Sequence, residues 1–158
     1  MRFQLATYRC DPNGHLFRAP TILGGHGVFL ARSSGEGDLA YVDAVSDDAF
    51  GDLRSILRGI PTFMQLHELE RGKVVQDLFS ITCDYDSQGA PYVLNRDPCC
   101  IHCSDCNVRF IEATDPPEFV DIDVPEVSHG RWDSMSVTDR RTAIEQALNE
   151  YFIDRADW

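Results

Sequence analysis

The chain has 158 residues, of which 43% are hydrophobic and 25% charged, a composition typical of a soluble globular domain with its own core. Its 26 acidic and 14 basic residues give a formal net charge of −12, which argues against direct binding of nucleic acid because phosphate contacts need clustered lysines and arginines. No apolar run is long enough to cross a membrane and the N-terminus has no secretory pattern, so we expect a single domain over residues 1–158, located in the cytoplasm.

The first part of the sequence predicts β-strands joined by turns. Residues 3–10 (FQLATYRC) alternate between apolar and polar and predict a short strand. The following CDPNGH is a turn by composition, since Pro, Asn and Gly each suit turn geometry. A second turn is predicted at residues 24–27 (GGHG), and the strands Val28–Arg32 and Leu39–Val45 then form a β-hairpin around a Gly-containing loop.

An amphipathic helix follows the hairpin. Ser46 or Asp47 can cap its N-terminus, and Gly59 and Pro61 end it. Its apolar residues recur at helical spacing: Ala49, Phe50, Leu53, Ile56 and Leu57.

Residues 62–85 are harder to assign. Their first half fits a helix, whereas residues 78–85 alternate and predict a strand with Phe79, Ile81, Cys83 and Tyr85 on one face. Residues 92–94 (YVL) are its expected partner strand. Cys83 on such a face is expected to be a small buried hydrophobic residue.

The last third predicts two further strands and a helix. Residues 108–113 (VRFIEA) form one strand, and residues 119–127 (FVDIDVPEV) alternate so that acids line one face and valines and an isoleucine the other. Ser136 and Asp139 form an S-x-x-D variant of the capping box, which predicts a helix from Val137 to about Asp154. The whole pattern predicts an α+β fold with a mostly antiparallel sheet, on which this amphipathic helix packs.

Four of the six cysteines lie in the segment PCCIHCSDC, residues 98–106. It contains two overlapping C-x2-C pairs, Cys100–Cys103 and Cys103–Cys106. Such a spacing lets a tight turn direct both sulfurs at one metal ion. The second pair is followed by Asn107, a residue that tolerates positive φ, so Cys103-Ser-Asp-Cys106-Asn is the favoured knuckle.

A second knuckle is expected far away in the sequence, and Cys10-Asp-Pro-Asn13-Gly has the form C-x-P-x-G. The two segments together resemble a degenerate zinc ribbon, in which Asn13 replaces the usual second cysteine. The resemblance implies structural zinc, a β-hairpin scaffold at one corner of the fold, and a ligand set completed by His15, Cys100 or Cys99. It implies no particular function. The candidate metal ligands are Cys10, His15, Cys100, Cys103 and Cys106.

Two other interpretations of the cysteines stay open. One is a decayed site that binds no metal and whose cysteines are free or paired. The other is a redox-active dithiol, which needs a thiolate of lowered pKa near a helix N-terminus or a cation.

No catalytic set is evident in the sequence, which lacks G-x-S-x-G, H-E-x-x-H and phosphate-binding glycine motifs, and we therefore predict that the protein is not an enzyme. Its acids are concentrated in residues 115–158, which hold 11 acids and four bases, a net charge of −7. These acids form either an ordinary solvated surface or a surface that attracts a basic partner.

We therefore predict an acidic interaction domain that binds a basic protein. One example of this class is an immunity protein that inhibits a toxin nuclease by occupying its phosphate-binding sites. The alternatives are a zinc-stabilised adaptor and a thiol-redox protein that uses residues 99–106. The candidate partner-binding residues are Asp115, Glu118, Asp121, Asp123 and Glu126.

Overall fold

The computed structural model describes residues 1–22, 27–34, 38–94 and 96–156, with only the backbone of residues 154–156. The turn predicted at residues 24–27 therefore lies largely outside the described residues. In chain order the elements are β1 (Arg2–Cys10), β2 (Leu16–Thr21), β3 (Val28–Ser33), β4 (Leu39–Asp43), α1 (Asp48–Arg58), α2 (Pro61–Met64), α3 (Glu68–Leu78), the 3₁₀ helix η1 (Phe79–Ile81), β5 (Tyr92–Leu94), β6 (Val108–Ala113), β7 (Phe119–Asp121), α4 (Gly130–Asp133) and α5 (Val137–Ala156).

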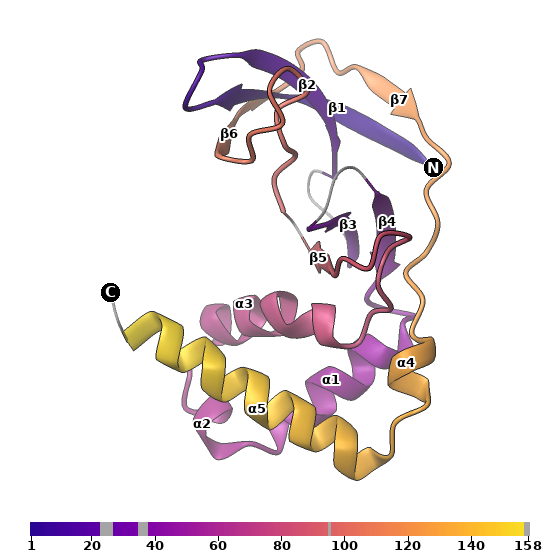
Figure 1. Ribbon diagram of the computed structural model, residues 1–158, viewed down its shortest axis with the longest axis vertical. Coiled ribbons are helices and arrows are strands. Elements are labelled where there is room, and N and C mark those ends of the chain that lie inside the picture. Colours follow the sequence, from indigo (N-terminus) through magenta and orange to yellow (C-terminus); the bar gives the residue numbers. More distant parts are fainter. Residues whose placement is uncertain (23–26, 35–37, 95, 157–158) are drawn as a thin grey trace.

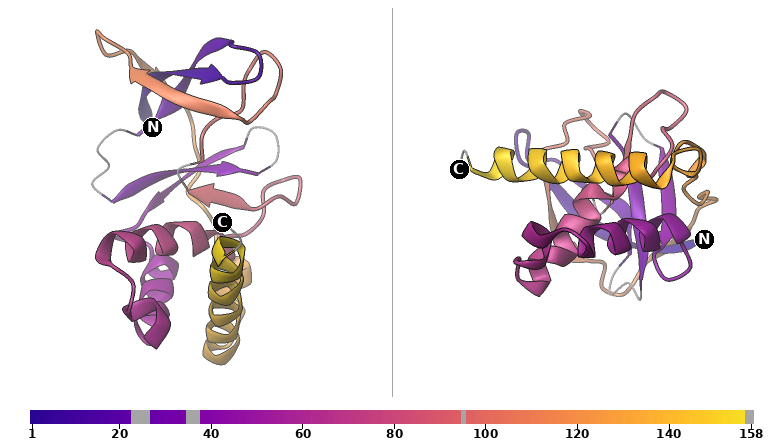
Figure 2. Two further views of the ribbon diagram at one scale, coloured as in Figure 1. Left: turned by 90° about the vertical axis from the view of Figure 1, so that its left-hand side faces the viewer. Right: turned by 90° about the horizontal axis from the view of Figure 1, so that it is seen from below.

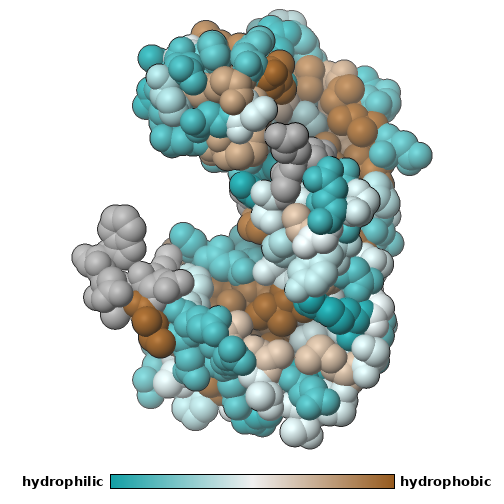
Figure 3. Space-filling model, viewed as in Figure 1, coloured by the Kyte–Doolittle hydropathy of each residue, from teal (hydrophilic) through white to brown (hydrophobic). Residues whose placement is uncertain are grey.

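The elements form an upper sheet, a second sheet below it, and helices at the opposite end from the upper sheet (Figure 1). All ladders within both sheets are antiparallel, and the α+β prediction is confirmed. The surface is hollowed between the upper sheet and the helical end (Figure 3). Within the described residues, no helix is long and apolar enough to cross a membrane.

The long strand β1 organises the upper sheet. It pairs with β2 on one side, and on the other side with β6 along its second half and with β7 along Arg2–Gln4. Its alternation buries Ala6, Tyr8 and Cys10 on one face, whereas Phe3 is buried in a separate cluster. The predicted strands at residues 3–10 and 108–113 are confirmed, and the connection between β1 and β2 is the predicted turn.

The second sheet has the strand order β4-β3-β5. The predicted hairpin is confirmed, with Leu30 opposite Tyr41 and Ala31 opposite Ala40. Residues 92–94 form a strand, but it pairs with β3 rather than with residues 78–85. A small apolar cluster around Phe3, Leu30 and Val124 joins this sheet to the upper one.

The strand predicted over residues 78–85 is wrong. The helix α3 continues to Leu78 and a 3₁₀ turn follows. Val75, Leu78 and Phe79 are buried at helical spacing, and this pattern outweighs the short alternation that suggested a strand. Cys83 is fully buried, as expected of a small hydrophobic residue, and its thiol lies 3.6 Å from the carbonyl oxygen of Phe79.

The helices begin at the predicted caps. Asp47 Oδ1 accepts a hydrogen bond from the backbone N–H of Phe50 at 2.7 Å at the start of α1. Ser136 Oγ accepts one from the backbone N–H of Asp139 at 3.2 Å at the start of α5. Most contacts of α5 are with α1 and α3 rather than with a sheet, because these helices occupy the layer next to it (Figure 2).

Candidate metal centre

The candidate metal centre lies where the β1–β2 turn meets the loop between β5 and β6. Cys10 is the last residue of β1, and the backbone N–H of Gly14 donates to its carbonyl oxygen at 2.7 Å. Gly14 has φ of 67°, a left-handed conformation that glycine adopts without strain. The turn thereby brings His15 back beside Cys10, and the backbone N–H of Cys10 donates to the carbonyl oxygen of His15 at 2.9 Å.

The second segment turns in a similar way. The backbone N–H of Ser104 donates to the carbonyl oxygen of Cys100 at 2.7 Å, and Ser104 has a positive φ of 59°. Cys100 and Cys103 are therefore the C-x2-C pair that forms the turn, and Ser104 takes the positive-φ position that we assigned to Asn107. The backbone N–H of Asp11 donates to the carbonyl oxygen of Asn107 at 3.0 Å and links the two segments.

Four side chains converge between these turns. The ligand atoms of Cys10, His15, Cys100 and Cys103 all lie within 4.8 Å of one another, and this group could hold a metal ion. The two sulfurs of Cys10 and Cys103 are 3.6 Å apart, and the sulfur of Cys100 lies 3.5 Å from His15 Nδ1. Cys10 and Cys100 are buried, whereas Cys103 is exposed, so the site opens to solvent on one side.

The structure does not bring Cys106 to this group. Cys106 forms a disulfide with Cys99, and the Cα atoms of these two residues are 4.0 Å apart. The chain turns at Ser104, which directs the sulfurs of Cys103 and Cys106 to different neighbours. The C-x2-C pair that belongs to the metal centre is therefore Cys100–Cys103. The pair that the sequence favoured, Cys103–Cys106, is not.

Asn13 has a role that the sequence pattern did not reveal. It occupies the position of the missing cysteine, and its Nδ2 lies 3.3 Å from the sulfur of Cys103, to which it donates a hydrogen bond. An amide donor next to a thiolate stabilises the negative charge on sulfur without binding the metal itself. The fourth ligand position is then filled by His15 from the same turn.

The electrostatics of the site favour a thiolate at one position. The backbone N–H of Asp105 lowers the pKa of the Cys103 thiol to about 6, with help from His15 and the neighbouring thiols. Burial raises the pKa of Cys10 above its usual value. A metal ion would remove this difference, because thiol ligands lose their protons on binding.

The five predicted partner-binding residues follow one edge of the molecule from the turn before β7 to the segment that leads to α4 (Figure 1). Four of them, Asp115, Asp121, Asp123 and Glu126, are exposed. Glu118 is half-buried and pairs with Arg18, whose Nη1 lies 2.5 Å from its Oε2. Its charge is therefore partly neutralised within the chain.

Exposed apolar side chains accompany these acids. Phe110 and Ile111 on β6 and Phe119 on β7 are each more than 40% exposed. The two strands pair with the same side of β1, β6 with its second half and β7 with its first, so these residues lie along one edge of the upper sheet, where the Arg2 guanidinium lies over the Phe119 ring. We call this region the β6–β7 strip and define it by these three residues together with Asp115, Asp121 and Asp123.

No protein-family model matches the chain, and neither a curated protein nor a solved structure matches it. The zinc-ribbon resemblance thus remains confined to the two knuckles.

Proposed function

We propose that the protein is a zinc-stabilised interaction domain that binds a basic protein partner. The observation that carries the proposal is the convergence of three cysteines and one histidine from two distant segments of the chain. Cys10 and Cys103 are 93 residues apart in the sequence, and His15 and Cys100 are 85 residues apart. The metal fastens the loop between β5 and β6 onto the β1–β2 hairpin.

The donor spacing supports zinc. Tetrahedral zinc, with bonds of about 2.3 Å to sulfur and about 2.0 Å to nitrogen, places two sulfurs about 3.8 Å apart and a sulfur and a nitrogen about 3.5 Å apart. The observed separations are 3.6 Å between Cys10 and Cys103 and 3.5 Å between Cys100 and His15. Three thiolates and an imidazole also favour zinc over magnesium or calcium, which prefer oxygen ligands. All four positions are filled by the protein, which is the arrangement of a structural rather than a catalytic zinc site.

The partner class follows from the β6–β7 strip. Its apolar residues supply surface that a partner can bury, and its acids supply attraction for lysines and arginines that flank such a contact. The net charge of −12 adds long-range attraction to a basic protein. An inhibitor of a basic toxin such as a nuclease is the member of this class that we expect.

The zinc site is tested by metal content. Protein purified without chelator should contain one zinc ion per chain by elemental analysis, and Cys100→Ser should lose it. Cys83→Ala is the matched control, because Cys83 is a buried cysteine outside the cluster and its removal should leave the zinc content unchanged. A zinc-free wild type whose Cys103 is alkylated rapidly at neutral pH would overturn the zinc proposal in favour of a thiol-redox function.

The partner is tested with the purified basic protein encoded by the neighbouring gene. Titration of wild type at 50 and 300 mM NaCl should show affinity that falls by about tenfold or more with salt, as contacts between opposite charges require. The double variant Asp121→Asn/Asp123→Asn should bind more weakly. Asp77→Asn/Glu150→Gln removes the same charge from exposed helical positions and should bind like wild type. Binding that is insensitive to both salt and the strip variant would refute the assignment.

A further inference from the structure

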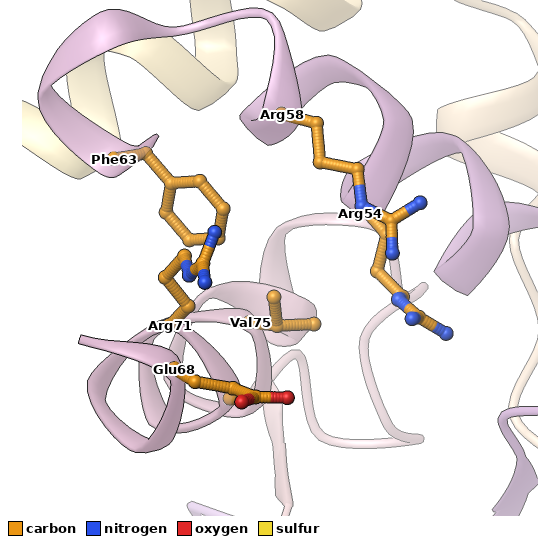
Figure 4. Close-up of a pocket in the computed structure, with 7 residues that line it drawn as sticks. Arg54, Arg58, Phe63, Glu68, Arg71 and Val75 are labelled. Carbon is orange, nitrogen blue, oxygen red and sulfur yellow. The ribbon is translucent and has the colours of Figure 1, made fainter. Parts of the chain in front are cut away.

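A pocket of about 290 Å³ lies between α1 and α3, at the helical end of the molecule and lined by no residue of the metal centre or the β6–β7 strip. Figure 4 shows Arg54 and Arg58 entering from α1 on one side, Arg71 and Phe63 on the other, and Val75 between them. We call it the arginine pocket. Its lining consists of Arg54, Arg58, Phe63, Glu68, Arg71, Gly72 and Val75.

The charges of this pocket are unusual for so acidic a chain. Four arginines, Arg18, Arg109, Arg140 and Arg141, lie within 4.0 Å of a carboxylate. Within the part of the chain that the structure describes, Arg54, Arg58 and Arg71 have no such ion pair. Three guanidinium groups thus line one pocket, in which Glu68 is the one carboxylate of the lining and forms no ion pair within 4.0 Å with any of them.

Helix stability does not account for this arrangement. Arg58 in the last turn of α1 interacts favourably with the helix dipole, but this explains only one of the three. Arg54 lies four residues before Arg58 on the same face, a spacing at which like charges destabilise a helix. The guanidinium of Arg71 lies 3.8 Å from the sulfur of Met64, which carries no charge. The repulsion is offset if an anion binds between the arginines.

We propose that the arginine pocket binds the phosphoryl group of a small phosphate monoester. The three arginines and Glu68 give the lining a net charge of +2, and a phosphate monoester carries about −1.5 to −2 at neutral pH, whereas a carboxylate carries −1. The guanidinium fork matches two phosphate oxygens at once. Phe63 and Val75 form an apolar wall against which the organic part of the ester packs.

The proposal is tested by calorimetric titration of the full chain with phenyl phosphate, inorganic phosphate and benzoate. Phenyl phosphate should bind saturably and more tightly than either of the other two. Arg71→Gln and Arg54→Gln should each weaken it by about tenfold or more, the usual effect of losing a charged hydrogen bond. Lys73→Gln is the matched control, since Lys73 is exposed on α3 but does not line the pocket, and it should bind like wild type.

Each other outcome overturns a stated part of the proposal. No saturable binding of phenyl phosphate, or equal weakening by Lys73→Gln, would refute the pocket as a site. Equal affinity for benzoate would refute the preference for a dianion, and equal affinity for inorganic phosphate would refute the apolar wall. Thermal unfolding of each variant is recorded alongside, and Arg54→Gln, which changes an exposed side chain, keeps the test valid if Arg71→Gln is unstable. Loss of zinc or of partner binding leaves these results unchanged, so the two proposals fail separately.

Discussion

A buried charge pair between the start of α1 and the start of α4 predicts how stability depends on pH. His129 Nε2 lies 2.9 Å from Asp47 Oδ2, and His129 Nδ1 lies 2.8 Å from the carbonyl oxygen of Thr82. Both partners are acceptors, so both ring nitrogens carry a proton and His129 is an imidazolium. The side chains of His129 and Asp47 are only 14% and 4% exposed, so water screens the pair weakly.

The pKa shifts of the two groups have opposite directions. Burial alone lowers the pKa of His129, but its hydrogen bonds to Asp47 and Thr82 outweigh burial and hold the pKa above its usual value. Burial raises the pKa of Asp47, and the hydrogen bonds from His129 and from the Phe50 N–H outweigh it and lower the pKa overall.

Each shift defines a pH window in which stability is lost. The native state keeps the His129 proton at a pH where the unfolded chain releases it. The His129 contribution is therefore complete below about pH 6.5 and is lost as pH rises through the folded-state pKa, at up to about 1.4 kcal/mol per pH unit. The Asp47 contribution is present above about pH 3.9 and is lost as pH falls through its lowered pKa.

The variant Asp47→Asn isolates the charge. Asn caps a helix about as well as Asp, so the hydrogen bond from the Phe50 N–H is kept while the ion pair is lost. Removing one partner of a buried pair costs about 3–5 kcal/mol. We expect the lower end, about 3 kcal/mol at pH 6, because His129 can lose its Nε2 proton and accept a hydrogen bond from the NH2 group of Asn. As pH rises through the raised pKa of His129 the wild-type pair loses its positive charge, and the difference should shrink toward about 1 kcal/mol, the value of a neutral hydrogen bond.

The assay is urea unfolding of wild type and Asp47→Asn at intervals from pH 5.5 to pH 9. The Cys103 thiol, whose pKa is lowered to about 6, makes the free energy of unfolding rise with pH, opposite to the effect of His129. This contribution is the same in both proteins, so it cancels when their free energies of unfolding are subtracted. Asp48→Asn is the control, because Asp48 is exposed next to the pair, and its difference from wild type should not vary over this range. A constant difference for Asp47→Asn across the range would refute the reasoning.

Two further predictions concern the cap of α5 and the metal centre. Ser136→Ala removes the acceptor of the Asp139 N–H and should lower the free energy of unfolding, measured with urea, by about 1 kcal/mol. Thr142→Ala, inside the same helix, should lower it by less. Equal losses would contradict the role of Ser136 as the helix cap. Treatment with a chelator should increase hydrogen exchange of the β1 and β6 amides, followed by mass spectrometry, while the amides of α1 and α5 stay protected. Loss of protection in all of these elements would contradict a metal that stabilises the upper sheet locally.

The sequence predicts the strands and helices with strong periodicity, but not the segment where two periods compete. In residues 78–85 the alternation of Phe79, Ile81 and Cys83 suggested a strand, and only the burial of Val75 and Leu78 on the preceding turn shows that the helical period continues. The alternation is a short local pattern, whereas the helical face is defined by the core that α1 and α5 share with α3. Such tertiary packing is not visible in a window of eight residues.

The same limit explains the candidate sites. Spacing alone shows that two C-x2-C pairs overlap, but the choice between them depends on which residue adopts positive φ, and the structure assigns this to Ser104 rather than to Asn107. Asn tolerates that conformation better than Ser, so propensity predicted the wrong turn. The arginine pocket was invisible for a related reason. Arg54 and Arg58 have a helical spacing, but the sequence does not show how the helix that fits the segment around Arg71 packs against them.

The sizes of the cores indicate what a metal ion would add to the upper sheet. The helical end and the second sheet share a large core that includes Phe50, Leu53 and Trp132. Four of the buried residues in the cluster on the upper sheet are alanines or cysteines. Among the described residues, this cluster consists of Ala6, Tyr8, Cys10, Phe17, Ala19 and Cys100. A core of this size buries little apolar surface, and small units of this kind are usually held together by disulfides or metal ions. Cys10 and Cys100 belong both to this cluster and to the metal centre, so one ion would fix the residues that close the small core as well as the loop above it.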